Sequence, residues 1–87
     1  MANHKSAEKR IRQTAKRRLR NRQKMTRMRS AIKKLRAAVA EGDQKTAQEL
    51  LQPTLSIVDR TAQKGVIHGN KAARTKSRLV YAVSSLG

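Results

Sequence analysis

Residues 9–24, KRIRQTAKRRLRNRQK, carry nine lysine or arginine side chains in sixteen positions and no acidic one. These groups are protonated at neutral pH and bind phosphate through charge and hydrogen bonds. Placed on a helical wheel, the bases from Lys9 to Arg29 occupy nearly the whole circumference. A one-sided array would suit a membrane surface or a single groove. An array that faces every direction indicates a helix enclosed by phosphates on several sides.

A second basic stretch, KGVIHGNKAARTKSRL, covers residues 64–79. Lys71, Arg74 and Arg78 are spaced i, i+3 and i+7, so they share one side of a helix. His68 and Asn70 lie at the predicted start of that helix, where free backbone N–H groups and the helix dipole attract phosphate. We therefore predict a second anion-binding site on a rigid part of the chain.

Other chemistry is poorly represented. Two isolated histidines and no cysteine exclude the usual zinc-binding spacings. The carboxylates are not paired for acid–base work, and no glycine-rich phosphate loop is present. No apolar run approaches the roughly 18 residues of a membrane span, and Trp and Phe are absent. We expect no enzymatic activity, no metal, no cofactor, no small-molecule substrate and no membrane partner.

The elements that position these bases are predicted to be helices, because apolar residues recur every three or four positions. The second of two such stripes keeps its phase across Pro53, which favours one kinked helix over two short ones. A third helix is predicted from about Asn70. The apolar residues are Met25, Met28, Ile32, Leu35 and Val39 in the first stripe, Ala47, Leu51, Leu55, Val58 and Ala62 in the second, and Ala72, Leu79, Val83 and Leu86 in the third.

Short turns separate the stripes. Gly42 is predicted to end the first helix in the left-handed conformation, and Asp43 to cap the next helix. Gly65 is predicted to end the second helix, with Val66 folding back on its end. Three helices joined in this way pack as an antiparallel up-down bundle, so we expect one all-α domain over residues 1–87.

The first helix is expected to be longer than its partners, because few breakers occur between Ser6 and Glu41. It would span about 54 Å at 1.5 Å per residue, so its N-terminal half must protrude from the bundle. We call residues 1–24 the arm and residues 25–87 the bundle. Of the net charge of +17, residues 1–36 contribute +14, residues 37–63 contribute −2 and residues 64–87 contribute +5.

The arm on its own should be a poor helix. Like-charged side chains stand four residues apart at several positions, including Arg12/Lys16 and Lys16/Arg20. At roughly 0.2–0.5 kcal/mol for each pair, they oppose the free helix by about 1–3 kcal/mol. Phosphates would reverse the sign of this energy, so we expect the arm to fold on its partner.

The partner is expected to be structured RNA. Repeated stacking on bases needs several aromatic side chains, and this chain has only Tyr81. The protein should therefore recognise backbone and shape. A leucine-zipper DNA-binding protein needs a long coiled coil, whereas the first apolar stripe ends at Gly42. A histone-like architectural DNA-binding protein is the alternative that the sequence leaves open.

The sequence resembles one known family closely. The segments MANHKSAEKRIRQTAKRRLRNR, IKK at residues 32–34, GD at 42–43, IVDR at 57–60 and KGVIHGNKAARTKSRL carry a resemblance to the bacterial small-subunit ribosomal protein numbered twenty. The resemblance runs from end to end and implies a three-helix bundle with an extended first helix. It also implies a cytoplasmic structural constituent of the small ribosomal subunit that binds ribosomal RNA directly and early in assembly.

Further partners follow from the same resemblance. They are the 5′ domain of the small-subunit RNA, the long helix near its 3′ end and other small-subunit components, and no homo-oligomer is expected. The RNA-binding residues implied by the resemblance are Asn3, Lys5, Ser6, Lys9, Arg10, Arg17, Arg18 and Arg20 in the first block, and Lys64, His68, Asn70, Lys71, Arg74, Lys76 and Arg78 in the last. The density of charge adds Arg12, Lys16, Arg22, Lys24, Arg27 and Arg29.

Two positions depart from the family pattern. Gly69 stands where the family usually has lysine, which removes a phosphate contact and loosens the start of the third helix. Thr61 replaces a usual alanine and is a small polar change on the second helix.

Overall fold

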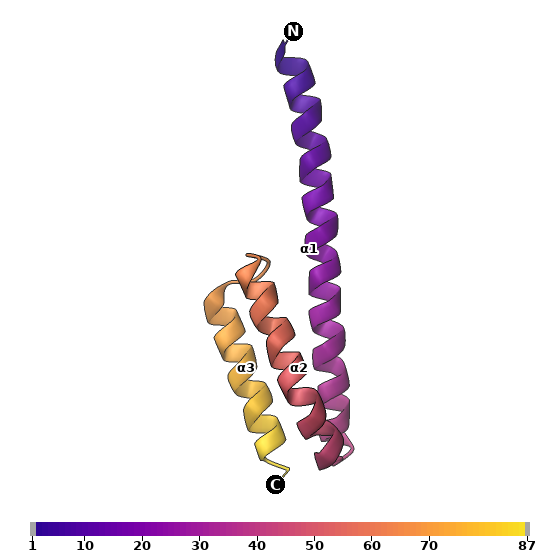
Figure 1. The fold of residues 1–87 in the computed structure, drawn as a ribbon, viewed down its shortest axis with the longest axis vertical. Coiled ribbons are helices and arrows are strands. Elements are labelled where there is room, and N and C mark those ends of the chain that lie inside the picture. The colour runs from indigo at the N-terminus through magenta and orange to yellow at the C-terminus, as the bar shows by residue number, and fades with distance from the viewer. Residues whose placement is uncertain (1, 87) are drawn as a thin grey trace.

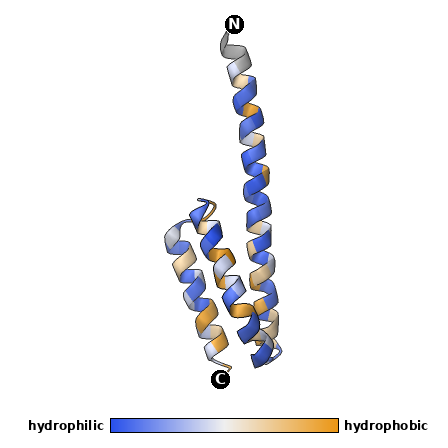
Figure 2. Ribbon diagram, in the orientation of Figure 1, coloured by the Kyte–Doolittle hydropathy of each residue, from blue (hydrophilic) through white to orange (hydrophobic). Residues whose placement is uncertain are grey.

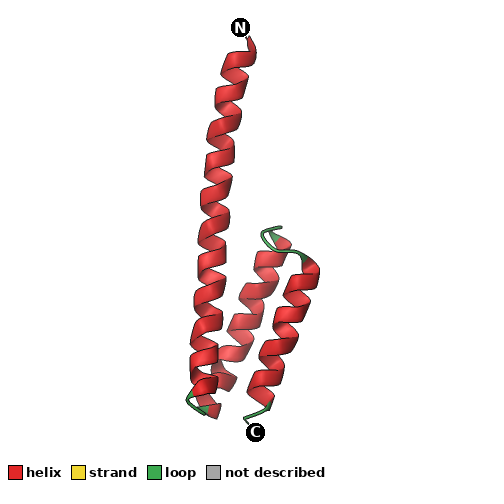
Figure 3. Cartoon of the chain, turned by 180° about the vertical axis from the view of Figure 1, so that it is seen from behind, coloured by secondary structure: helices red, strands yellow, loops and turns green. Residues whose placement is uncertain are grey.

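Three helices make up the protein. A computed structural model describes residues 2–86, with side chains described for residues 6–86. The helices are α1 (Ala2–Ala40), α2 (Gln44–Gln63) and α3 (Gly69–Ser84), and no strand occurs in the described part of the chain (Figures 1 and 3). Helix α2 runs antiparallel to both neighbours and packs against each of them (Figure 1). The predicted all-α, up-down bundle with an extended first helix is confirmed.

Both turns end a helix with a glycine in the left-handed region. Gly42 has φ +73° and Gly65 has φ +76°. The N–H of Gly65 donates to the carbonyl of Ala62 at 2.9 Å, and that of Val66 donates to Thr61 at 3.1 Å. The corresponding bonds at Gly42 and Asp43 reach Val39 and Ala38, each at 3.0 Å. This pair of bonds satisfies the last carbonyls of each helix, so the predicted caps are confirmed.

The core forms two clusters along the bundle. Leu35 and Ala38 of α1, Ala47 of α2, and Leu79 and Val83 of α3 meet near the α1–α2 turn. The second cluster lies near the α2–α3 turn and consists of Met28, Val58, Ile67 and Ala72. Each cluster therefore draws on both neighbours of α2, and burial of these aliphatic groups holds the three helices together.

The buried face of α2 differs from the predicted stripe. Ala47 and Val58 are buried, but Leu51, Leu55 and Ala62 are only partly buried. Two threonines are buried instead. The hydroxyl of Thr54 donates to the Leu50 carbonyl and that of Thr61 to the Ile57 carbonyl, both at 2.7 Å. These bonds within the helix let a polar side chain occupy the core. The helix continues through Pro53, as the phase of the stripe predicted.

Helix α1 is 39 residues long, against 20 in α2 and 16 in α3. The molecule measures 65 × 21 × 15 Å, and its radius of gyration is 17.7 Å. A compact domain of this length would have a radius of gyration of about 12 Å. The difference comes from the arm, which extends well past the ends of α2 and α3 (Figure 1).

Candidate nucleic-acid interface

The arm protrudes from the bundle along most of its length. Every described side chain from Ser6 to Gln23 is exposed, and Lys24 is the first that is partly buried. Hydrophilic residues surround this half of α1 on nearly all sides (Figure 2). Its apolar side chains are exposed as well, with Ile11 at 68% and Leu19 at 57%. The arm therefore presents its bases to a partner without support from the rest of the chain.

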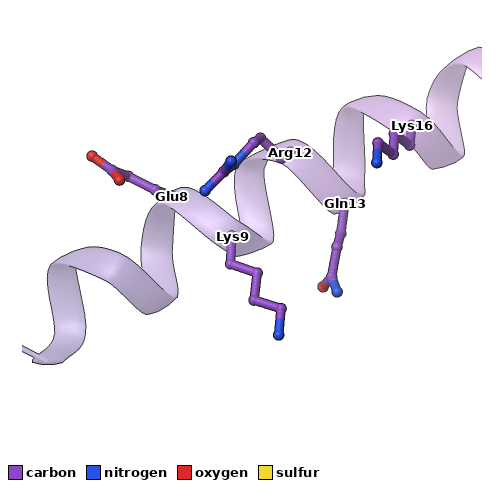
Figure 4. Close-up of a pocket in the computed structure, with 5 residues that line it drawn as sticks. All are labelled: Glu8, Lys9, Arg12, Gln13 and Lys16. Carbon is purple, nitrogen blue, oxygen red and sulfur yellow. The ribbon is translucent and has the colours of Figure 1, made fainter.

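A close view of the arm shows how its charges are spread. Lys9 and Gln13 extend toward one edge of the helix in Figure 4 and Arg12 toward the other edge, while their spacing places all three on one side of α1. The shallow depression between these side chains is bordered by α1 alone, so it is a gap on one helix and not a cleft between elements. The nine-residue spacing of Arg18 from Lys9 places it on the opposite side of the arm, where it is also exposed. An enclosing polyanion can therefore reach bases on both sides of the arm at once.

Nine of the twenty-one predicted RNA-binding residues lie on this exposed surface of the arm. The side chains of Asn3 and Lys5 fall outside the described residues. Arg27 and Arg29 lie beyond the arm, exposed on the part of α1 that belongs to the bundle. The exposed predicted residues of the arm are Ser6, Lys9, Arg10, Arg12, Lys16, Arg17, Arg18, Arg20 and Arg22.

The predicted second site lies on α3. Lys71, Arg74 and Arg78 are all exposed, and their helical spacing places them along one side of α3, as the sequence predicted. Tyr81 follows Arg78 on the same helix and is 76% exposed. The bases thus stand on a helix whose other side is anchored by the buried residues Ala72, Leu79 and Val83.

The start of α3 is capped by the protein itself. His68 is the N-cap residue, and its Nδ1 accepts a hydrogen bond from the Asn70 N–H at 3.1 Å. This N–H group is therefore already satisfied within the chain, and the predicted attraction of phosphate to this helix start stays a prediction. Gly69 is the first residue of α3, and a Cβ placed there would meet nothing within 4 Å. The structure would therefore accommodate a lysine at this position, the residue that the sequence resemblance leads us to expect there.

Lys76 has a partner within the chain. Its Nζ lies 2.8 Å from Oδ1 of Asp59, which joins α3 to α2. Both side chains are partly exposed, so the pair contributes little to stability. Lys76 nevertheless differs from the other predicted RNA-binding lysines and arginines whose side chains are described, because its charge is already neutralised in part.

The two basic regions adjoin at one end of the bundle. The up-down topology places the α2–α3 turn and the start of α3 at the end of the bundle from which the arm emerges (Figure 1). The acidic residues Glu41 and Asp43 lie in the α1–α2 turn at the other end. The positive potential is therefore concentrated where the arm leaves the bundle, which favours the approach of a polyanion from that end.

A small cavity lies at the point where the arm joins the bundle. Four basic residues border it, Lys24 and Arg27 from α1, Arg60 from the last turn of α2, and Lys64 at the end of α2. Arg60 was not among the predicted binding residues. Arg60 reaches the cavity because of the register in which α2 packs on α1. This register cannot be deduced from a single sequence.

No group of three or more metal-binding side chains occurs among the residues whose side chains are described. None of the helices, over the described residues, has an apolar stretch long enough to cross a bilayer.

Fold and charge together define a class, a small three-helix protein whose long cationic helix projects from its bundle. The family model of ribosomal protein S20 matches residues 2–84. The chain belongs to the ribosomal protein S20 family, as the sequence motifs indicated.

Similar proteins cover the full length of the chain. A protein named small ribosomal subunit protein bS20 from Magnetococcus marinus is 54% identical over 86 residues, which are 99% of this chain and 94% of the relative. The protein of the same name from Syntrophobacter fumaroxidans is 49% identical over 99% of this chain and all of the relative. The one from Nitrosomonas europaea is 49% identical over the whole of both chains.

Membership of this family establishes the general role. The chain is a structural constituent of the bacterial small ribosomal subunit, in the cytoplasm, and not an enzyme. Association with the subunit implies association with its RNA, whereas the residues that make the contact are a separate question.

Proposed function

We propose that the chain binds small-subunit ribosomal RNA directly and stabilises the folded RNA during assembly, mainly by neutralising phosphates. The arm (residues 1–24) inserts among RNA segments, and Lys71, Arg74 and Arg78 form a second grip on the bundle. The bases predicted from the sequence supply most of the contacts. One observation carries this proposal, namely the complete exposure of a described cationic helix from Ser6 to Gln23.

Energetics support an inserted arm. A protruding helix with like charges on all sides gains little stability from side-chain packing, since no described side chain between Ser6 and Gln23 is even partly buried. Phosphates on several sides would convert the repulsion between neighbouring bases into attraction. The counterions released from the RNA add a favourable term that depends on salt.

The geometry supports a clamp rather than a point contact. The arm and the N-terminal part of α3 emerge at the same end of the bundle, from helices that are separated by α2 (Figure 1). The RNA partners that the family resemblance implies are the 5′ domain and the long helix near the 3′ end. A protein that grips with two separate surfaces can hold two such segments together.

Salt dependence tests direct binding. The affinity of the purified chain for folded small-subunit RNA is measured between about 50 and 300 mM KCl. If about eight phosphates are contacted, log K against log salt has a slope of about −6 to −7. A slope shallower than about −2 contradicts the proposal. Duplex DNA is measured alongside, and equal retention of both nucleic acids would favour the histone-like alternative.

A matched pair of variants tests the role of the arm. Replacing Arg10, Lys16, Arg17 and Arg20 with glutamine should make the slope shallower by about 3. The control carries the same change of charge outside the predicted sites, at Lys33, Lys34, Arg36 and Lys45, all of them exposed. Its slope should change by less than about 1. Equal losses in the two variants would show that net charge alone governs binding and that the arm has no special role.

A further inference from the structure

The cavity between α1 and α2 has the composition of a phosphate site. Its volume is about 160 Å³, and Lys24, Arg27, Ile57, Arg60, Thr61 and Lys64 border it. The space equals that of several water molecules at about 30 Å³ each, which is ample for one tetrahedral oxyanion. Four of the six bordering residues are basic and none is acidic, so two helices that are far apart in sequence direct their cations to one place.

The charges around this cavity have no acidic partner among the described residues. The ion pair recorded for the described side chains joins Lys76 to Asp59, on the side of α2 that meets α3. Although Asp59 precedes Arg60 in sequence, it is therefore engaged elsewhere. Four cations that share a cavity repel one another, and an anion bound between them would remove that repulsion.

The floor of the cavity increases the effect of an anion. Thr61 is buried, with 4% of its surface exposed, and Ile57 is partly buried. The Thr61 hydroxyl donates to the Ile57 carbonyl at 2.7 Å, so it is already satisfied. A partly apolar wall lowers the local dielectric and strengthens the attraction between an anion and the bases at the rim.

The helix dipole explains only part of this cluster. Arg60 lies in the last turn of α2 and Lys64 is its C-cap residue, where cations interact favourably with the dipole. Lys24 and Arg27, in contrast, lie in the middle of α1, more than three turns from its end at Ala40. A bound anion accounts for all four bases together.

We propose that this cavity, which we call the junction site (Lys24, Arg27, Arg60 and Lys64), binds one phosphate group of the RNA backbone. The proposal rests on the proposed function and adds to it a defined contact and a residue, Arg60, outside the predicted set. Lys24 is the last residue of the arm, so a phosphate held here bridges the base of the arm to α2. It fixes the first turn of the arm and lets the helix grow outward from the bundle.

Two double variants with the same loss of charge test the junction site. Arg60→Gln with Lys64→Gln removes the contribution of α2, and Arg36→Gln with Lys45→Gln is the control. All four side chains are exposed, and none of the control positions borders the cavity. Circular dichroism melts confirm that both variants keep the bundle. For folded small-subunit RNA, the first variant should weaken binding about tenfold and reduce the salt slope by about 1, and the control less than twofold.

Free phosphate provides a readout that does not depend on RNA. Inorganic phosphate is added to the ¹⁵N-labelled chain at constant ionic strength, held with chloride. Amide signals around the four junction residues should shift and saturate in the unmodified chain and in the control. They should stay unchanged in the Arg60/Lys64 variant. Shifts spread along the arm in proportion to its bases, or persisting in that variant, would overturn the proposal.

The two failures can be told apart. If the unmodified chain binds RNA with a steep salt slope but both double variants weaken equally, the junction site is wrong and the proposed function stands. If the slope is shallow while phosphate saturates the cavity, direct RNA binding is wrong, the cavity takes free phosphate, and the assignment to an RNA phosphate fails with it.

Discussion

One continuous helix passes through two very different environments in this protein. In the bundle, Leu35 of α1 is completely buried, whereas Leu19 in the arm is 57% exposed on the same helix. The bundle half of α1 is held by α2 and α3, whereas the described side chains of the arm from Ser6 to Gln23 are exposed. Residues that favour a helix do not by themselves make it stable, because most of the stability of a helix in a protein comes from packing.

The arm could not join the core even if its neighbours were longer. Leu19 and Leu35 are sixteen residues apart, which at about 3.6 residues per turn places them on nearly opposite sides of α1. The apolar residues Ile11, Ala15 and Leu19 therefore do not continue the stripe that faces α2. The arm is built to be surrounded by something other than protein of its own chain.

A leucine-to-alanine substitution should have its largest difference in effect on stability between the bundle and the arm. Leu35→Ala leaves a cavity among Ala38, Ala47 and Leu79, and it should lower the free energy of unfolding by about 2–5 kcal/mol. Leu19→Ala removes an exposed side chain and should change it by less than about 0.5 kcal/mol. Urea unfolding followed by circular dichroism, without RNA, measures both values.

A large loss of stability in Leu19→Ala would contradict this contrast, since it would mean that the arm packs against something in the free protein. Concentration dependence of the unfolding midpoint would then identify self-association as the source. Equal small losses in both variants would show instead that the core cluster around Leu35 does not support the fold.

Amide hydrogen exchange should also differ between the arm and the bundle. Repulsion between bases four residues apart disfavours the free arm helix by about 1–3 kcal/mol, so its amides should exchange rapidly without RNA. Bound RNA should protect them, and the bundle amides should be protected in both states. The measurement is residue-resolved exchange over residues 6–23 compared with α2, at low salt and with folded small-subunit RNA.

The outcome that would contradict this prediction is strong protection of the arm in dilute buffer without nucleic acid. A helix that resists exchange there would have an internal source of stability. The proposal that phosphates order the arm would then lose its basis, although the family of the protein would be unaffected.

Much of the fold could be predicted because its signals are local. The steps of three and four in the first stripe place α1, and the Gly-Asp pair at residues 42–43 places the first turn. The lack of helix breakers between Ser6 and Glu41 predicts a first helix longer than its partners, so that its N-terminal half protrudes, and the structure confirms it. The burial of Thr54 and Thr61 was missed, because a hydroxyl that bonds to its own helix enters a core without an apolar signature.

The interface was less accessible from sequence for a related reason. Exposed bases can be counted, but their neighbours across helices depend on register. RNA binding was the only role predicted for Lys76. Its ion pair with Asp59 depends on how α3 packs on α2. Arg60 lies outside both basic blocks and reaches the cavity only through packing of α2 on α1.

The Asp43 carboxylate is a charge in the bundle that its own chain stabilises, unlike the bases of the arm. Its removal has the smallest effect that we predict. Asp43 caps α2, accepting hydrogen bonds from the Thr46 hydroxyl at 2.6 Å and the Thr46 N–H at 3.2 Å. The hydroxyl bond, with a smaller effect of the backbone bond, lowers the pKa of the Asp43 carboxyl below its ordinary value. Asp43→Ala should lower the melting temperature of the bundle by a few degrees at pH 7.

The pH dependence of this cap follows from the direction of the pKa shift. A carboxyl whose pKa is lower in the folded state stabilises that state fully above its unfolded pKa, about 4, and loses the effect as the pH falls through the lower folded value. Asp43→Ser keeps an acceptor that does not titrate. The advantage of the unmodified chain over this variant should therefore shrink between about pH 5 and pH 2. A constant difference across that range would show that the ionised carboxylate is not what stabilises the start of α2.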